Sequence, residues 1–232
     1  MIVYNTKGLS YVESVNCCTC VGYSCYYTCG DALDKNDKIK PGNVDTVKIV
    51  YNGDVTPTLV AELISALDEI NVGYPAAKSI KLFISIFGGS MESGYLAYQA
   101  VKGSKIPVET INAGMTASSA TLVYCGAPKR YTFPDASFIL HPSASPNLKA
   151  EWIRPNDVEF IRKDVEDGNK CFKSIYGSCT TLARQVVEKI LFSNDYARYL
   201  RPKDAEKIKL SQGVVEGIAS TFVSYYITEV KN

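Results

Sequence analysis

The sequence of 232 residues has almost no excess charge and no long apolar run. Its 25 Lys and Arg residues balance 24 Asp and Glu residues, and the net charge of +1 offers no basic surface for nucleic acid. No apolar stretch approaches the roughly 18 residues that span a bilayer. The opening residues, MIVYNTKGLSYVESVN, lack the basic and apolar regions of a signal peptide. We therefore expect a cytoplasmic protein that binds neither nucleic acid nor membrane.

The sequence also has a single histidine and no recognisable phosphate-binding loop. The glycine-marked turns match neither G-x-x-x-x-G-K-S/T nor G-x-G-x-x-G, and we expect no cofactor. His141 is the single histidine, so any serine–histidine pair must use it. A lone histidine is often structural. His141, however, follows the apolar run SFIL and precedes Pro142, which places it at the end of an expected strand, where ligands collect in parallel sheets.

Cysteine is present but unevenly placed. Five of the eight cysteines fall within CCTCVGYSCYYTC, at Cys17, Cys18, Cys20, Cys25 and Cys29. Four thiolates could hold a zinc ion, but the spacing gives no pair of C-x-x-C knuckles and no histidine lies nearby. We favour free thiols in a Tyr-rich hairpin and expect no metal site.

The rest of the chain alternates between strand and helix patterns. Residues 1–45 form a Cys- and Tyr-rich N-terminal appendage with a charged Pro-Gly connector. Beyond it, apolar periodicity predicts strands at 45–55, 79–87, 106–114, 129–133, 136–141 and 213–220, and helices at 56–73, 91–104, after 114, at 154–177 and at 180–192. This alternation predicts an α/β fold with a mainly parallel sheet.

Two strand-to-helix turns carry candidate chemistry. Gly88 and Gly89 end one strand, and the segment GMTASSATL places Ser118 and Ser119 before a helix. Helix N-termini present free N–H groups that can hold an anion, including a transition-state oxyanion. The alternatives are that the glycines are simple turn residues and that the serines begin a packed helix.

Three segments, in this order, resemble the proteolytic subunit of the Clp protease and its phage relatives. They are FGGSMESGYLAYQAV, GMTASSATLVYCGAPKRYTFPDASFILHPS and LRPKDAEKIKLSQGVVEGI. That family has a strand ending in Gly-Gly-Ser, a segment G-x-A-A/S-S that bears the nucleophile, and a strand ending in His-x-Pro or His-Pro. The resemblance covers about residues 46–220 and implies a crotonase-like, Clp-protease-like spiral of βα units with a helical handle region. It implies a catalytic domain at 46–222 and a C-terminal tail at 223–232.

The resemblance also implies roles for individual residues. Ser118 would be the nucleophile of a serine endopeptidase and His141 its general base. Asp195 would be the third residue of the triad, with Asn194 as the alternative. The oxyanion would be held by backbone amides, contributed by Gly88, Gly89 and Ser119.

The same resemblance implies partners. Polypeptide substrates would be cut inside a homo-oligomeric ring, and an ATP-dependent unfoldase becomes a candidate partner. The expected helix within 155–176 carries Val158, Phe160, Ile161 and Val165 among charges, a mixed face suited to an interface.

Two other functions stay open. Phe87 stands where the family usually has proline, and SASPNLKAEWIRPND replaces its glycine-rich groove segment. These departures favour a catalytically weak or inactive ring subunit as the first alternative. The second is a crotonase-type enzyme acting on acyl-CoA thioesters, in which two backbone amides polarise the thioester carbonyl.

Overall fold

The computed structural model describes residues 2–5, 41–146 and 151–229. The cysteine cluster between Cys17 and Cys29, with its expected free thiols, lies outside the described residues. The same is true of most of the expected N-terminal appendage.

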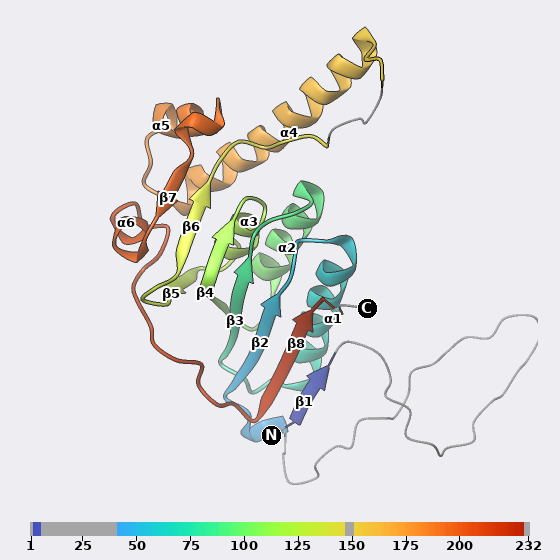
Figure 1. Cartoon of the computed structure of the whole chain (residues 1–232). Helices are drawn as coiled ribbons and strands as arrows, with labels where there is room; N and C mark the ends of the chain where they lie inside the picture. Colours follow the sequence, from blue (N-terminus) through green and yellow to red (C-terminus); the bar gives the residue numbers. More distant parts are fainter. Residues whose placement is uncertain (1, 6–40, 147–150, 230–232) are drawn as a thin grey trace, which may run out of the picture.

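One eight-stranded sheet forms the centre of the molecule, with β1-β8-β2-β3-β4-β6-β7 as the order of its main path and β5 paired to β4 (Figure 1). All neighbouring strands run parallel except β6 and β7. The strands are β1 Ile2–Asn5, β2 Thr46–Asn52, β3 Ser79–Ile86, β4 Val108–Ala117, β5 Lys129–Thr132, β6 Ser137–Leu140, β7 Arg198–Leu200 and β8 Val223–Thr228. The parallel α/β arrangement expected from the sequence is confirmed.

Helices α1, α2 and α3 follow one another across one face of the sheet, while α4 projects beyond it (Figure 1). The α-helices are α1 Pro57–Gly73, α2 Met91–Gly103, α3 Ala120–Cys125, α4 Pro155–Cys179, α5 Arg184–Ile190 and α6 Pro202–Lys207. Two short 3-10 turns are η1 Pro41–Asn43 and η2 Asn194–Tyr196.

Local sequence signals explain where two of the helices begin. The Thr56 hydroxyl accepts a hydrogen bond from the Leu59 amide at 3.2 Å, and Pro57 supplies the first turn of α1. The Ser90 hydroxyl likewise accepts from the Ser93 amide at 3.1 Å and caps α2. The serine of the Gly-Gly-Ser turn is therefore a helix cap.

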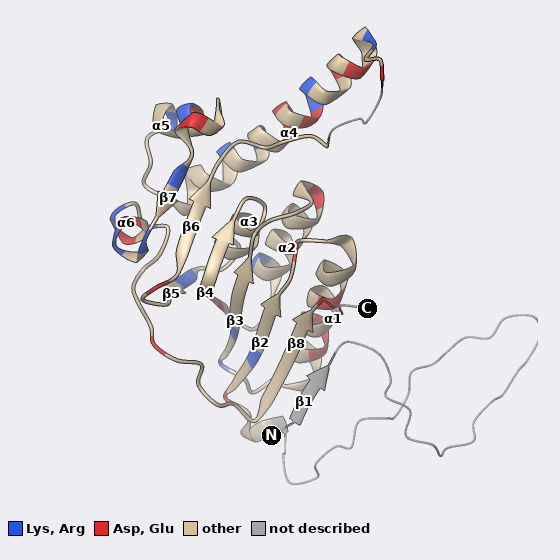
Figure 2. Ribbon diagram, in the orientation of Figure 1, with Lys and Arg blue, Asp and Glu red and all other residues tan. Residues whose placement is uncertain are grey.

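The core lies between the sheet and these helices. It takes the alternating buried side chains of the strands and one face of each helix, among them Ile49, Tyr51, Leu63, Leu82 and Tyr124. Long α4 contributes to the core only in its second half, through Phe172, Ile175 and Tyr176. Its first half carries exposed ion pairs of Arg162 with Glu159 and Glu166. Figure 2 shows basic and acidic residues alternating along this part of α4.

The last strand differs from the sequence-based expectation. Residues 213–220 form no strand, and Val214 makes only an isolated bridge to Thr132. The strand is β8, which lies between β1 and β2 and buries Val223, Tyr225 and Ile227. The expected domain division stays a prediction, but Val223–Thr228 of the expected tail belong to the sheet.

Candidate active site

Four segments of the chain meet at one edge of the sheet. Gly88, Ser118 and His141 follow the ends of β3, β4 and β6, which are parallel neighbours. Asp195 lies in η2, just before β7, and β7 runs antiparallel to β6. The carboxyl ends of parallel strands share one edge, so the topology gathers all four sequence-predicted positions in one region.

Ser118 occupies a sharp turn between β4 and α3. Its φ of 54° lies in the left-handed region, which non-glycine residues rarely adopt. The Ser118 amide donates to the Ile139 carbonyl at 3.3 Å, and the Ser118 carbonyl accepts from the Thr121 amide at 2.9 Å. The side chain is half-buried. A strained strand-turn-helix of this kind is known to present a nucleophilic serine above a parallel sheet.

Gly88 lies directly against this serine. A Cβ atom added to Gly88 would be 2.6 Å from the Ser118 Cβ and 3.2 Å from its Oγ. The φ of Gly88 is 130° and that of Gly89 is 140°, conformations that favour glycine. Gly89 is also wedged against the backbone of Val55, where an added Cβ would lie 2.4 Å from the carbonyl oxygen. Glycine is therefore required at both positions, because the neighbouring atoms leave no room for a Cβ atom.

Three amides around Ser118 are candidate oxyanion donors; Gly89 is exposed, whereas Gly88 and Ser119 are buried. Within the described residues, the N–H groups of Gly88, Gly89 and Ser119 donate to no carbonyl in the turns around the site. The Ser119 side chain is fully buried, and its hydroxyl has no hydrogen-bond partner among those residues.

His141 is half-buried and is held by its own neighbour. Its Nδ1 lies 2.7 Å from the Pro142 carbonyl oxygen. A carbonyl can only accept, so Nδ1 carries the proton and Nε2 is left as an acceptor. This is the tautomer that a general base needs.

The two hydrogen bonds expected within the triad are not formed in the described part of the structure. Ser118 and His141 share no hydrogen bond there, and His141 Nδ1 is paired with Pro142 instead of residue 194 or 195. Asp195 is exposed, and its carboxylate accepts from the Ser193 hydroxyl at 2.9 Å.

Sequence reasoning missed two links between α3 and α4. Cys125 and Cys179 form a disulfide with their Cα atoms 5.7 Å apart. One turn away, the Thr121 and Tyr176 hydroxyls lie 2.8 Å apart. The partners in each link are separated by more than fifty residues, and no local pattern pairs them.

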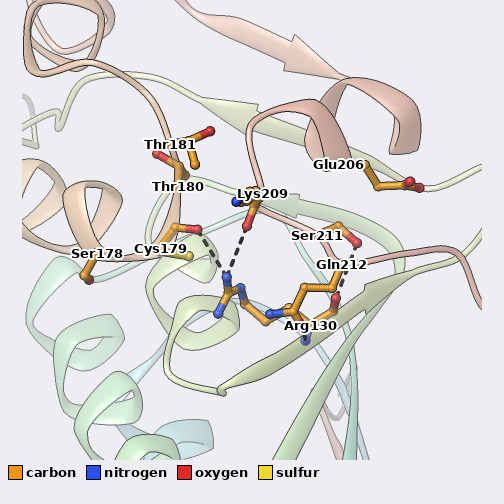
Figure 3. A pocket seen from close by; sticks show the side chains of 9 residues that line it. All are labelled: Arg130, Ser178, Cys179, Thr180, Thr181, Glu206, Lys209, Ser211 and Gln212. Atoms are coloured by element: carbon orange, nitrogen blue, oxygen red, sulfur yellow. Dashed lines mark hydrogen bonds between the residues drawn. The ribbon is translucent and has the colours of Figure 1, made fainter.

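A separate pocket of about 500 Å³ is built around Arg130 (Figure 3). Among the described residues, its guanidinium donates to the backbone carbonyls of Ala127, Cys179, Lys209 and Leu210. Burial lowers the pKa of Arg130. Arg130 thus ties the end of α4 and the loop after α6 to β5, and its role is structural.

The described residues contain no cluster of three or more His, Cys, Asp or Glu side chains placed to hold a metal. Among the helices in the described ranges, none is long and apolar enough to cross a membrane.

A mainly parallel α/β sheet with a half-buried serine on a strained strand-to-helix turn is the arrangement expected for the Clp-protease class. The family model for Clp protease matches residues 37–219, and the chain belongs to that family. It is 29% identical to the ATP-dependent Clp protease proteolytic subunit 3 of Rhizobium meliloti, with 74% of this chain and 84% of the relative covered. It is also 29% identical to the chloroplastic proteolytic subunit 4 of Arabidopsis thaliana, with 73% of this chain covered but only 56% of that relative.

A solved structure shares the fold. A mutant of ClpP1 from Listeria monocytogenes superposes with a TM-score of 0.59 at 18% identity, with 73% of this chain and 91% of that one covered. The Clp-protease fold expected from the sequence is confirmed.

Proposed function

We propose that the protein is a serine endopeptidase in which Ser118 is the nucleophile. The observation that supports this most is the turn at Ser118, where a positive φ lifts the serine out of the strand and Gly88 packs against its side chain. The family match over residues 37–219 favours a peptidase over the acyl-CoA alternative.

In the proposed reaction, His141 moves the proton and the backbone amides hold the developing charge. His141 Nε2 takes the proton of the Ser118 hydroxyl as Oγ attacks the peptide carbonyl carbon. The oxygen becomes an oxyanion that accepts from the amide of Ser119 and from that of Gly88 or Gly89. His141 then gives its proton to the leaving amine. Water hydrolyses the acyl-serine by the reverse proton path.

Asp195 remains our proposed third residue, with Asn194 as the alternative. Both lie in η2 immediately before β7, the antiparallel neighbour of β6. In the chain as described, the Pro142 carbonyl holds His141 Nδ1 in the same tautomer that a carboxylate would hold. A carboxylate would in addition stabilise the imidazolium that forms during attack.

We also propose assembly into homo-oligomeric rings. Exposed apolar side chains support this, since Val158 and Phe160 of α4 are 56% and 63% exposed. The relatives are named as subunits of an ATP-dependent protease, which makes an ATP-driven unfoldase a candidate partner. The cytoplasm remains the proposed location.

One observation favours a second function, that of an inactive ring subunit. Within the described residues Ser118 and His141 are not hydrogen-bonded, and the Asp195 carboxylate is engaged by Ser193. If no ligand or neighbouring subunit brings Ser118 and His141 within hydrogen-bond distance, the same fold would serve only in assembly.

Peptide hydrolysis by two neighbouring variants tests the proposal. Ser118→Ala should lower kcat by at least about a thousandfold, because the nucleophile is lost. Ser119→Ala should keep substantial activity, because only the backbone amide of Ser119 takes part. Equal loss in both variants, or loss only in Ser119→Ala, would show that the nucleophile is assigned one residue out of place.

A further inference from the structure

Two buried hydroxyl groups connect α4 to the turn that carries Ser118. Thr121 Oγ1 lies 2.6 Å from the Ser118 carbonyl oxygen and 2.8 Å from the Tyr176 hydroxyl. Thr121 and Tyr176 are both fully buried. The disulfide between Cys125 and Cys179 joins the same two helices one turn further along.

The direction of these hydrogen bonds is fixed by chemistry. The Ser118 carbonyl can only accept, so the single hydroxyl proton of Thr121 points to it. Thr121 Oγ1 must then accept from Tyr176. Burial raises the pKa of Tyr176, so the phenol keeps the proton that it donates. The chain of donation therefore runs from Tyr176 to Thr121 to the carbonyl of Ser118.

That carbonyl belongs to the same peptide unit as the Ser119 amide. A trans peptide is planar, and its C=O and N–H groups point in opposite directions. Two hydrogen bonds on the Ser118 oxygen, from the amide and the hydroxyl of Thr121, therefore fix where the Ser119 N–H points. The same contacts stabilise the positive φ of Ser118, a backbone conformation that is unfavourable for a residue with a Cβ atom.

We propose that Thr121 and Tyr176 are positioning residues, which aim the Ser119 amide at the oxyanion through the carbonyl of Ser118. The proposal rests on the proposed peptidase function of Ser118. It makes α4 part of the support of the catalytic turn, because Tyr176 reaches Thr121 from that helix.

Kinetics of matched variants test the role. Thr121→Val removes the hydroxyl at nearly constant volume and should lower kcat about tenfold with KM unchanged, a fraction of the loss that follows deletion of an oxyanion donor. Thr121→Ser keeps the hydroxyl and should stay within about twofold of wild type. Tyr176→Phe leaves Thr121 in place and should cost about threefold in kcat.

Two controls remove comparable buried hydroxyls that do not reach Ser118. Thr110 Oγ1 donates to the Tyr124 carbonyl at 2.9 Å, and Tyr124 donates to the Tyr131 carbonyl at 3.0 Å. Thr110→Val and Tyr124→Phe should lower stability as the test variants do, yet leave kcat within about twofold of wild type. A tenfold loss of kcat in Thr110→Val would overturn the proposal, because any buried hydroxyl would then have the same effect.

Crystal structures supply a readout that does not depend on activity. In Thr121→Val the peptide between residues 118 and 119 should rotate or adopt two orientations, while Thr121→Ser and Thr110→Val keep it in place. An unmoved peptide in Thr121→Val overturns the proposal, whatever the kinetics show. A rotated peptide in an enzyme whose wild type hydrolyses nothing would support the positioning role and reject the peptidase function.

Discussion

At the scale of single residues, the site depends on backbone conformations that few side chains tolerate. Ser118 and Gly88 face each other across two strand ends, with φ values of 54° and 130°. The sequence placed both at the right edge of the sheet, because Gly-Gly and Ser-Ser each follow an apolar strand pattern. It could not show the strain at Ser118, which arises from contacts with Thr121 and Ile139 that form only in the folded chain.

Gly88→Ala should therefore lower peptidase activity by at least about tenfold. The added methyl group would displace Ser118, and φ at residue 88 would cost about 1–3 kcal/mol. Gly103→Ala is the matched control, since a Cβ there meets nothing within 4 Å at the end of α2. Both variants are compared by kcat and by thermal unfolding. Equal activity in the two would contradict the close approach of Gly88 to the nucleophile.

At the scale of secondary structure, periodicity predicted helices α1 to α5 and strands β2 to β6, but it missed the short helix α6 and the strands β7 and β8. Of these, β8 has the sequence VSYYIT, which is rich in β-branched and aromatic residues, the signal that could have found it. GVVEGIAS was preferred although two glycines weaken it as a strand, and in the structure it is a loop. The contact of α3 with α4 could not be predicted, because it depends on how the second half of α4 packs against the core.

The disulfide at that contact should stabilise the fold. Cys125 and Cys179 are 54 residues apart, and closing a loop of that size is worth about 4 kcal/mol in the chain-entropy model. Reduction, or Cys125→Ser, should lower the free energy of unfolding by an amount of that order, measured in urea. Cys171→Ser is the control, because Cys171 is a free, half-buried thiol. Identical stability of oxidised and reduced protein would contradict this role.

At the scale of the whole molecule, the two halves of α4 have different surroundings. Its second half is packed in the core and supports Ser118, whereas its first half is exposed and carries apolar side chains among ion pairs. Val158 and Phe160 on the first half of α4 stay exposed among the residues that the structure describes. The interface predicted from the sequence stays a prediction, because the single chain does not show which surface would cover these side chains.

Phe160→Asp should weaken assembly, because it places a charge in the proposed apolar contact. We expect wild-type protein to run as a large oligomer in light scattering at micromolar concentration and Phe160→Asp to run as smaller species. Val72→Asp is the control: Val72 is 79% exposed at the end of α1, away from α4. A wild-type monomer that retains activity would contradict the ring.

The central claim is that Ser118 is an activated nucleophile served by His141. A fluorophosphonate probe, followed by peptide mapping, tests it most directly, because the probe reacts with activated serines and reports which one. The account predicts a single adduct on Ser118, absent in Ser118→Ala, nearly absent in His141→Ala and retained in Ser119→Ala. An unlabelled wild-type protein, or an adduct on any other serine, would contradict it and leave an inactive ring subunit as the better account of the fold.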